Sequence, residues 1–337
     1  MPPLSGAEAA LAAFRKGCPA LLKRIDASGL TQPGDWAEPC SPAADTTDAR
    51  RFFTRYFAAI RVADGRGLNT GYYEPELAAS RTRAPGYAVP LYRRPPDLVE
   101  ADLGQFDLAL EGKRIRGRVD DRRLVPYPDR GAIDDGALAG RGLELAWAAD
   151  TYAAFFLEIQ GSGRLRLPDG SVLRVGYDGQ NGLPYTAIGK RLRERNALAP
   201  GQATMAGIIG WMRAHPADAR DLLRENRSKV FFRVLTLPSD AGPPGALGVP
   251  LTAEVSVAAD PRFVPLGCPL WLESTVGGVA LRRMMVAQDT GGAIKGANRL
   301  DLFRGSGDAA GAVAGGITAT GSTTLLIPLA AARRVAG

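Results

Sequence analysis

The stretch MMVAQDTGGAIKGANRLDLFRG, from Met284 to Gly305, decides the fold of this chain. It begins as an apolar strand, passes through the turn Asp289–Gly292, and places a second acid, Asp301, between Leu300 and Leu302. Four glycines in so short a segment allow positive φ angles and a close approach of backbone to a ligand. Two acids that flank one glycine-rich loop indicate a functional site, although a turn cap and an exposed strand position would explain each acid singly.

The same stretch belongs to a run of short strands separated by glycine turns, which predicts a small closed β-barrel. The expected strands are Ala253–Ala258, Leu270–Glu273, Val279–Ala287 and Leu300–Phe303. A segment rich in glycine and proline, Ser239–Gly248, precedes them and gives the expected domain boundary. A length of 337 residues favours two domains over one.

The N-terminal segment predicts two helices. Ser5 as N-cap and Glu8 three residues later form a capping box, and Gly17 would end the first helix. Residues 29–42, which contain proline and glycine, are expected to be a loop. The second helix starts at a cap of Thr46, Thr47 and Asp48. One face of this helix is expected to pack in the core, because its apolar residues recur at i, i+3, i+4 and i+7. These residues are Phe53, Tyr56, Phe57 and Ile60.

The middle of the chain mixes strands and helices. Strands at residues 165–167 and 172–175, joined by Pro168-Asp169-Gly170, predict a hairpin. Ahead of it, Gln160–Gly163 reads as a polar, flexible loop at a strand end, either a sugar contact or a plain linker. The other expected elements are a helix around residues 135–138, a turn at 178–182, helices at 186–195, 203–214 and 217–225, and a strand at 229–235.

A further motif, Gly71-Tyr72-Tyr73-Glu74-Pro75, predicts a strand that leaves the first core at the edge of a cleft. Aromatic rings stack on the apolar faces of sugars, and phenol hydroxyls bond sugar hydroxyls. The alternative is that one tyrosine packs in the core while the other faces water.

Composition limits the classes of function. The net charge of +7 carries no dense run of Lys or Arg, so no nucleic acid partner is expected, and an anionic cell-wall polymer fits as well. The single histidine, His215, excludes a histidine-rich metal site, and no metal or cofactor is predicted. The cysteines leave a Cys18–Cys40 disulfide and buried thiols equally open. Neither a transmembrane run nor a signal peptide is visible.

Five segments, in order, resemble the MltA family of lytic murein transglycosylases, whose C-terminal 3D domain is named for three aspartates. They are Gly71–Pro75, Glu158–Gly163, Asn226–Phe232, Ala259–Gly267 and Met284–Gly305. The resemblance covers most of the chain from Thr70 to Ile327. It implies a mainly β fold with some helices: a double-psi β-barrel domain of residues 1–77 and 240–337, an inserted, second barrel-like domain of residues 78–239, and a groove between them.

The activity that the resemblance implies is cleavage of the β-1,4 bond between N-acetylmuramic acid and N-acetylglucosamine without water, leaving 1,6-anhydromuramic acid ends. Asp301 would act first as acid and then as base, since burial and nearby Asp289 would raise its pKa. Asp289 would either support Asp301 without touching the substrate or stabilise the oxocarbenium-like charge, and Asp260 would be a structural turn acid. One departure from the family pattern is Leu300 ahead of Asp301. The expected substrate-binding residues are Tyr72, Tyr73, Glu74, Gln160, Gly161, Ser162, Gly163, Gly291, Gly292 and Lys295.

The resemblance also implies a periplasmic or outer-membrane location for a monomer that acts on peptidoglycan glycan strands, with cell-wall synthesis or division complexes as partners. Two other functions are weighed. Asp289-Thr290-Gly291 matches the aspartic protease signature, which occurs once here and would need a homodimer. A double-psi barrel that grips cell-wall glycan without cutting it is the second alternative.

Overall fold

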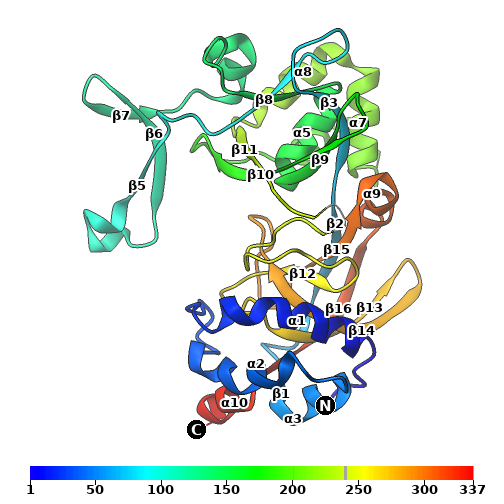
Figure 1. Ribbon diagram of the computed structural model, residues 1–337. Helices are drawn as coiled ribbons and strands as arrows, with labels where there is room; N and C mark the ends of the chain where they lie inside the picture. Colours follow the sequence, from blue (N-terminus) through cyan, green and yellow to red (C-terminus); the bar gives the residue numbers. More distant parts are fainter. Residues whose placement is uncertain (200, 239–240, 337) are drawn as a thin grey trace. The chain divides into compact units, whose positions relative to one another are not determined.

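The computed structural model describes residues 1–199, 201–238 and 241–336, and it is a sheet-rich fold with helices. The chain forms two compact units: unit 1 is Met1–Glu74 with Pro238–Gly337, and unit 2 is Pro75–Leu237. Figure 1 shows the elements of both. The predicted domain boundary at residues 239 and 240 lies outside the described residues, so the predicted domain limits stay a prediction.

The described part of unit 1 contains a seven-stranded sheet in the order β1-β16-β13-β14-β12-β15-β2. A further pairing between β16 and β2 closes six of these strands into a ring, which leaves no free edge among them. Within the ring, β12–β14 and β15–β2 pair in parallel and the other pairs are antiparallel. The strands are β1 Phe57–Ile60, β2 Arg66–Glu74, β12 Ser256–Ala259, β13 Pro269–Val276, β14 Val279–Asp289, β15 Leu300–Ser306 and β16 Thr318–Pro328.

Helices of unit 1 gather beside this ring, where α1, α2, α3 and α10 lie together in Figure 1. The helical elements are α1 Ala7–Leu21, η1 Pro33–Trp36, α2 Ala37–Ala43, α3 Ala49–Tyr56, α9 Gly307–Gly315 and α10 Leu329–Ala336. One core joins helices and strands, because Phe14, Phe52 and Phe53 are buried together with strand residues such as Leu270 and Leu302. Burial of this apolar surface is the main force that holds the helices on the barrel.

Three predictions for the N-terminal segment are wrong. The cap of α1 is Gly6 at φ 79°, without a side-chain cap bond, so Ser5 and Glu8 form no capping box. The helix continues past Gly17 to Leu21, since the face that carries Cys18 and Leu21 packs into the core. Residues 29–42 hold η1 and much of α2, and a capping box with a proline in the first turn starts η1.

The second helix starts where the sequence predicts. The side chain of Asp48 accepts a hydrogen bond from the backbone N–H of Arg51 and so caps α3. The helix ends at Tyr56, however, and Phe57 and Ile60 belong to β1, which pairs with β16. The predicted helical face therefore continues as a strand, because pairing along β16 fixes these residues in extended backbone.

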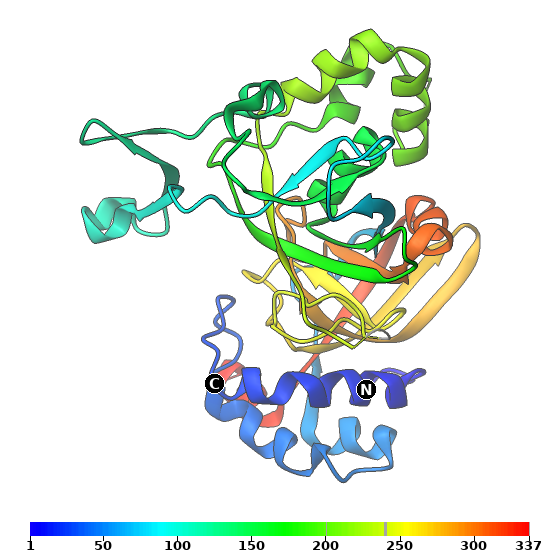
Figure 2. The same ribbon diagram turned by 45° about the horizontal axis from the view of Figure 1, so that its top comes forward.

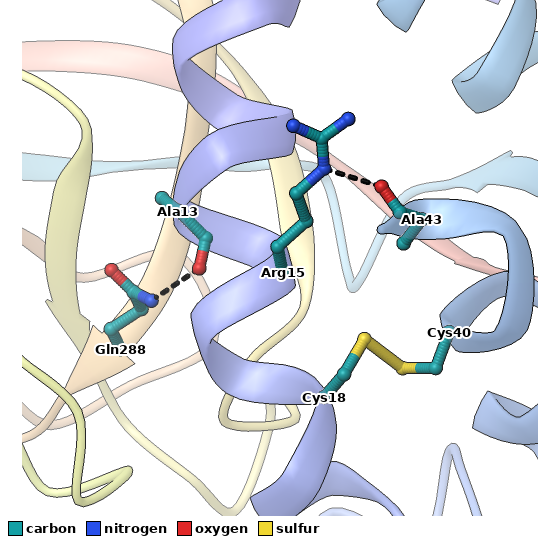
Figure 3. The surroundings of a disulfide bond; sticks show 6 residues. All are labelled: Ala13, Arg15, Cys18, Cys40, Ala43 and Gln288. Carbon is teal, nitrogen blue, oxygen red and sulfur yellow. Dashed lines mark hydrogen bonds between the residues drawn. A yellow bond between two sulfur atoms is a disulfide. The ribbon is translucent and has the colours of Figure 1, made fainter. Parts of the chain in front are cut away.

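A disulfide between Cys18 and Cys40 ties α1 to α2, and this resolves the alternatives that the sequence left open. Figure 3 shows this bond and two neighbouring side-chain contacts of α1. Gln288 Nε2 donates to the carbonyl of Ala13 over 2.9 Å, and Arg15 Nε donates to the carbonyl of Ala43. The third cysteine, Cys268, is buried and free. The end of β14 that carries Asp289 is thus braced by α1.

Unit 2, over the residues that the structure describes, has a six-stranded sheet in the order β11-β10-β9-β3-β8-β4. A parallel bridge between Arg93 and Phe232 links its two outer strands. A separate three-stranded sheet, β5-β6-β7, extends from the body of this unit (Figure 2). The strands are β3 Glu76–Ser80, β4 Val89–Tyr92, β5 Val99–Asp102, β6 Arg114–Asp120, β7 Arg123–Pro126, β8 Glu144–Ala148, β9 Ser162–Arg166, β10 Val172–Gln180 and β11 Val230–Val234.

The helices of unit 2 include the two predicted ones on either side of His215. The helical elements are η2 Leu103–Gln105, η3 Leu108–Leu110, α4 Arg130–Ala132, η4 Ile133–Ala137, α5 Thr151–Gln160, α6 Ile188–Glu194, α7 Met205–Ala214 and α8 Pro216–Glu225. Within the described part of the chain, no helix is long and apolar enough to cross a membrane.

The predicted hairpin of β9 and β10 is confirmed, with Gly170 at φ 81° in its turn. The predicted loop at residues 160–163 is wrong. Gln160 is the last residue of α5, Gly161 ends the helix at φ 78°, and Ser162 begins β9. The turn expected at residues 178–182 is wrong in part, because β10 extends through Gln180.

Candidate active site

The two acids of the opening stretch lie on neighbouring parts of the barrel. Asp289 is the last residue of β14, and Asp301 is the second residue of β15. The strand β12 runs between them, and its Ala258 is in register with Asp289 on one side and with Asp301 on the other. Residues in register across a sheet point to the same face, so both carboxyl groups face the same side of the barrel wall.

Asp301 is half-buried and is held by side chains from two segments. The hydroxyl of Thr70 on β2 donates to Oδ1 of Asp301 over 2.5 Å. Arg299 Nη2 in turn donates to the oxygen of Thr70 over 2.8 Å. Since a guanidinium only donates, the single hydroxyl hydrogen of Thr70 is directed at the carboxyl group. Among the described residues, no donor bonds Oδ2, so this oxygen is the one free to carry a transferable proton.

The environment favours the protonated form of Asp301. Burial raises the pKa of its carboxyl group above the ordinary value. The hydrogen bond from Thr70 and the charge of Arg299 oppose this rise, and the negative charge of Asp289 adds to it. Desolvation outweighs the two opposing effects, so the net pKa shift is upward. A carboxyl group of this kind can deliver a proton at a pH where an exposed aspartate would already have lost it.

Asp289 is half-buried as well, but its hydrogen bonds differ. Tyr72 on β2 donates its hydroxyl to Oδ2 over 2.9 Å, and the backbone N–H of Ala246 donates to Oδ1 over 2.9 Å. Burial raises the pKa of Asp289, while the bonds from Ala246, Tyr72 and Thr290 lower it. Burial and the adjacent Asp289 raise the pKa of Tyr72 well above its usual value, which keeps the phenol protonated as a donor.

Tyr72 is held in place by its neighbours on the barrel. Its ring packs against Phe303 of β15 with 5.3 Å between ring centroids. The preceding residue, Gly71, leaves room for α9, because a Cβ atom there would lie 2.8 Å from Ile317 and 2.9 Å from Ala314. Gly71 therefore allows α9 to pack closely on β2, the strand that carries Thr70 and Tyr72.

Asp260, the third acid, ties the loop between β14 and β15 to the barrel. Its side chain is fully buried, it pairs with Arg262 over 2.7 Å, and it accepts from the backbone N–H of Gly296 over 2.9 Å. These bonds hold the pKa of Asp260 well below its usual range. Gly296 adopts φ 115°, a conformation that favours glycine. Gly291 and Gly292 have ordinary φ angles, so positive φ is needed at only part of this loop.

Several residues predicted to bind substrate lie elsewhere. Tyr73 is 9% exposed and packs under α9, where it lies within 2.8 Å of a Cβ atom built on Gly311. Glu74 is 1% exposed and accepts from the hydroxyl of Ser306. This burial argues against both predictions, because a sugar contacts only side chains that are open to solvent. Lys295 is exposed, and no ion pair to it occurs among the described residues.

The remaining predicted contacts belong to unit 2. The side chain of Gln160 lies at the C-terminus of α5, and Gly161, Ser162 and Gly163 lead into β9. Gly163 is enclosed, because a Cβ atom there would lie 2.3 Å from Leu157. Gly161 to Gly163 therefore serve the tight passage from helix to strand.

Sequence reasoning missed Thr70, which donates to Asp301, and Arg299, which donates to Thr70. Thr70 directly precedes the Gly71–Pro75 motif, and Arg299 lies inside the Met284–Gly305 stretch, two residues before Asp301. Their meeting depends on the parallel pairing of Asp301 with Thr70, which joins segments 231 residues apart. In the described ranges, no group of three or more His, Cys, Asp or Glu residues is arranged to hold a metal ion.

Comparison with known proteins adds an independent line of observation. Residues 68–233 match the MltA specific insert domain, and residues 255–327 match the 3D domain. The membrane-bound lytic murein transglycosylase A of Vibrio cholerae is 39% identical over 198 residues, which are 56% of this chain and 52% of that protein. The chain thus spans about half the length of this curated relative.

Solved structures are similar over nearly the whole chain. The membrane-bound lytic murein transglycosylase from Agrobacterium tumefaciens is 32% identical, with a TM-score of 0.87 over 98% of this chain and 97% of that one. Escherichia coli MltA with bound chitohexaose is 28% identical, with a TM-score of 0.72 over 96% of this chain and 89% of that one.

Proposed function

The chain belongs to the MltA family of lytic murein transglycosylases, and from this membership we propose that it cleaves the glycan strands of peptidoglycan. The bond cut is the β-1,4 bond between N-acetylmuramic acid and N-acetylglucosamine, and the new end is a 1,6-anhydromuramic acid. The observation that carries this proposal is Asp301, a half-buried carboxyl group with one oxygen bonded to Thr70 and the other without a bond to any residue that the structure describes. Binding of chitohexaose by Escherichia coli MltA supports an oligosaccharide substrate.

In the first step, Asp301 gives its proton to the oxygen of the scissile bond while positive charge develops at C1 of the muramic acid. Donation leaves Asp301 as a carboxylate, which the Thr70 hydroxyl and the Arg299 charge stabilise. In the second step, Asp301 takes the proton of the sugar's own 6-hydroxyl group, whose oxygen attacks C1. A tethered nucleophile of this kind has an effective molarity on the order of 10⁵ M or more.

Asp289 supplies negative charge near the oxocarbenium-like centre. Burial raises the pKa of both acids, and three hydrogen-bond donors, from Ala246, Tyr72 and Thr290, oppose this rise at Asp289 and favour its ionised form. An ionised Asp289 raises the pKa of Asp301 and stabilises positive charge on the sugar in the same arrangement. Tyr72 orients this carboxylate by its bond to Oδ2.

Further sugar contacts come from the loop after β14 and from unit 2. Gly291, Gly292 and exposed Lys295 lie on the loop that Asp260 fastens, and Lys295 would meet a lactyl or peptide carboxylate. Gln160 and Ser162 are proposed to bond sugar hydroxyl and N-acetyl groups. We also infer that the six-stranded ring of unit 1 is a double-psi barrel, which its mixture of parallel and antiparallel pairs supports.

Membership of the MltA family also supports a proposal for where the protein acts and with which partners. The Vibrio cholerae relative is described as membrane-bound, which supports a place at the bacterial envelope, in the periplasm or at the outer membrane. We propose that the protein acts there as a monomer, with cell-wall synthesis or division complexes as its partners.

The experiment that tests this function is mass analysis of purified sacculi after incubation with the protein. The expected products are 1,6-anhydro-muropeptides. Products with reducing ends would indicate attack by water and hence a hydrolase, and binding without release would favour a glycan-binding barrel.

A further inference from the structure

Unit 2 contains a cavity of about 590 Å³ that has no part in the proposed chemistry. Residues of β4, of α4 and η4, of α5, and of α8 line it, together with Lys229 just before β11. All of these residues belong to unit 2, whereas Asp289 and Asp301 belong to unit 1. The volume lies within the range of small-molecule sites.

The floor of the cavity is a buried charge cluster. Arg130 and Lys229 are 3% and 7% exposed, and both contact Glu158, which is 7% exposed. Arg130 Nη2 lies 2.7 Å from Glu158 Oε2, and Lys229 Nζ lies 2.9 Å from Glu158 Oε1. Burial alone would raise the pKa of Glu158, but the two cations lower it below its usual value. The floor therefore holds two positive charges against one fully buried negative charge.

The second partner of Lys229 is weaker. Asp134 Oδ1 lies 3.5 Å from Lys229 Nζ, and the side chain of Asp134 is 37% exposed, so water competes for it. An ammonium group has three N–H donors, of which Glu158 takes one at short distance. A ligand carboxylate that displaced Asp134 would restore full pairing of a buried cation.

The lining as a whole has a small excess of positive charge, with Arg130, Arg220, Arg224 and Lys229 against Asp134, Asp150 and Glu158. Arg220 and Arg224 line the cavity, and both pair with Asp135, whose side chain is 53% exposed. Exposed ion pairs of this kind are weak and exchange readily. An entering anion thus meets two arginines before it reaches the buried lysine, which favours anionic ligands over cationic ones.

The walls are apolar and shaped by aromatic rings. Tyr92, Ile133 and Phe155 are at most 4% exposed and line the cavity beside Leu223. The guanidinium of Arg130 lies over the ring of Phe155 at 4.7 Å, which holds the cation toward the floor. Such walls suit small aliphatic side chains.

We propose that this cavity binds the carboxylate end of a short peptide with small apolar side chains, and that Lys229 recognises the carboxylate. The site goes beyond the proposed cleavage reaction, because it needs neither Asp301 nor Asp289. Peptide carboxylates of this chemistry have two sources, the peptides attached to the glycan and free peptides.

Calorimetric titration of the full chain with N-acetyl-alanyl-alanine, in L,L and D,D forms, tests the site. We expect saturable binding of at least one form and binding at least about tenfold weaker for its C-terminal amide. Absence of saturable binding to either form, or equal binding of acid and amide, overturns the proposal.

Variants locate the binding. Lys229→Met is expected to weaken the affinity at least about tenfold, whereas Lys190→Met, on an exposed lysine of α6, leaves it unchanged. Because Lys229→Met also disturbs the buried cluster, Arg224→Gln at the rim provides a second variant, with a few-fold loss of affinity expected and little loss of stability. Unchanged affinity in both folded variants overturns the assignment.

Cosedimentation separates the two sources of peptide. In an Asp301→Asn background, Lys229→Met should weaken binding to peptide-bearing sacculi but not to glycan freed of peptides. If sacculus binding stays unchanged while dipeptide binding is lost, the ligand is a free peptide. Failure of the cleavage proposal would appear in the sacculus products and would leave the dipeptide titration as it is.

Discussion

Asp289 and Asp301 lie opposite the same residue, Ala258, on the two strands that flank β12. Two interstrand spacings separate their Cα atoms, roughly 9–10 Å. At this separation the two carboxyl groups affect each other's charge, and Asp289 raises the pKa of Asp301. The sheet register therefore creates an acid with one oxygen anchored, whose pKa is raised first by burial and further by its neighbour Asp289.

Removing the Tyr72 hydroxyl tests the partner acid. Tyr72→Phe keeps the ring on Phe303 but takes one donor from Asp289, so the pKa of Asp289 should rise. We expect activity to fall about tenfold or more, in line with a lost hydrogen bond to a charged group. The acidic side of the pH–rate profile should also move to higher pH. An unchanged profile would remove Asp289 from the mechanism.

Thr70 offers a matched pair of variants. Thr70→Val removes the donor to Asp301 Oδ1 and leaves Arg299 without one partner, while Thr70→Ser keeps the hydroxyl. Because the carboxylate form of Asp301 loses stabilisation, turnover should drop roughly ten- to a hundredfold in Thr70→Val. Thr70→Ser should retain most of the activity. Equal kinetics of the two variants would show that only the shape of the side chain matters.

The raised pKa of Asp301 also predicts a pH dependence of stability. Between the ordinary pKa of an aspartate and the raised folded value, the native state binds more protons than the unfolded state. The free energy of unfolding therefore falls as pH rises through this window. Asp301→Asn removes this effect, so it should stabilise the protein at neutral pH, by about 1.4 kcal/mol for each unit of pKa shift.

Urea unfolding of the wild type and Asp301→Asn at several pH values measures the difference. The gain should vanish below the ordinary range of aspartate, near pH 4. A variant that is less stable than the wild type at neutral pH would mean that the folded protein does not raise the pKa of Asp301.

Asp260 should show the opposite dependence. Its folded pKa is depressed, so its contribution is present above the ordinary aspartate pKa and is lost as pH falls through the folded value. Asp260→Asn should cost about 1–3 kcal/mol of unfolding free energy at neutral pH. The difference from the wild type should shrink in acid, as thermal unfolding across pH can measure. A constant difference at every pH would point to lost packing alone.

The sequence predicted much of the barrel because glycine turns and apolar runs are local signals. The acid at the end of β14 and the acid inside β15 stand where these signals put them. The continuation of α1 through Gly17 was missed, because burial of Cys18 and Leu21 outweighed the low helix propensity of glycine. The helix end at Gln160 was missed because the apolar run before it was interpreted as a strand, although Gly161 is a common helix-ending residue.

The interior of the site was less predictable. The bond from Thr70 to Asp301 depends on parallel strand pairing between distant segments, and so does the bond from Arg299 to Thr70. The burial of Tyr73 follows from α9, which the sequence did not predict, and Glu74 is buried where it bonds Ser306 at the end of β15. In both cases the deciding information is tertiary, and no periodicity along the chain carries it.

The most direct test of the central claim is the rate at which Asp301→Asn releases 1,6-anhydro-muropeptides from sacculi, measured by mass analysis beside the wild type. Asparagine keeps the bond to Thr70 but has no proton to deliver, so the folded variant should be about 10²- to 10⁴-fold slower. A folded Asp301→Asn protein that releases these products at the wild-type rate would contradict the account.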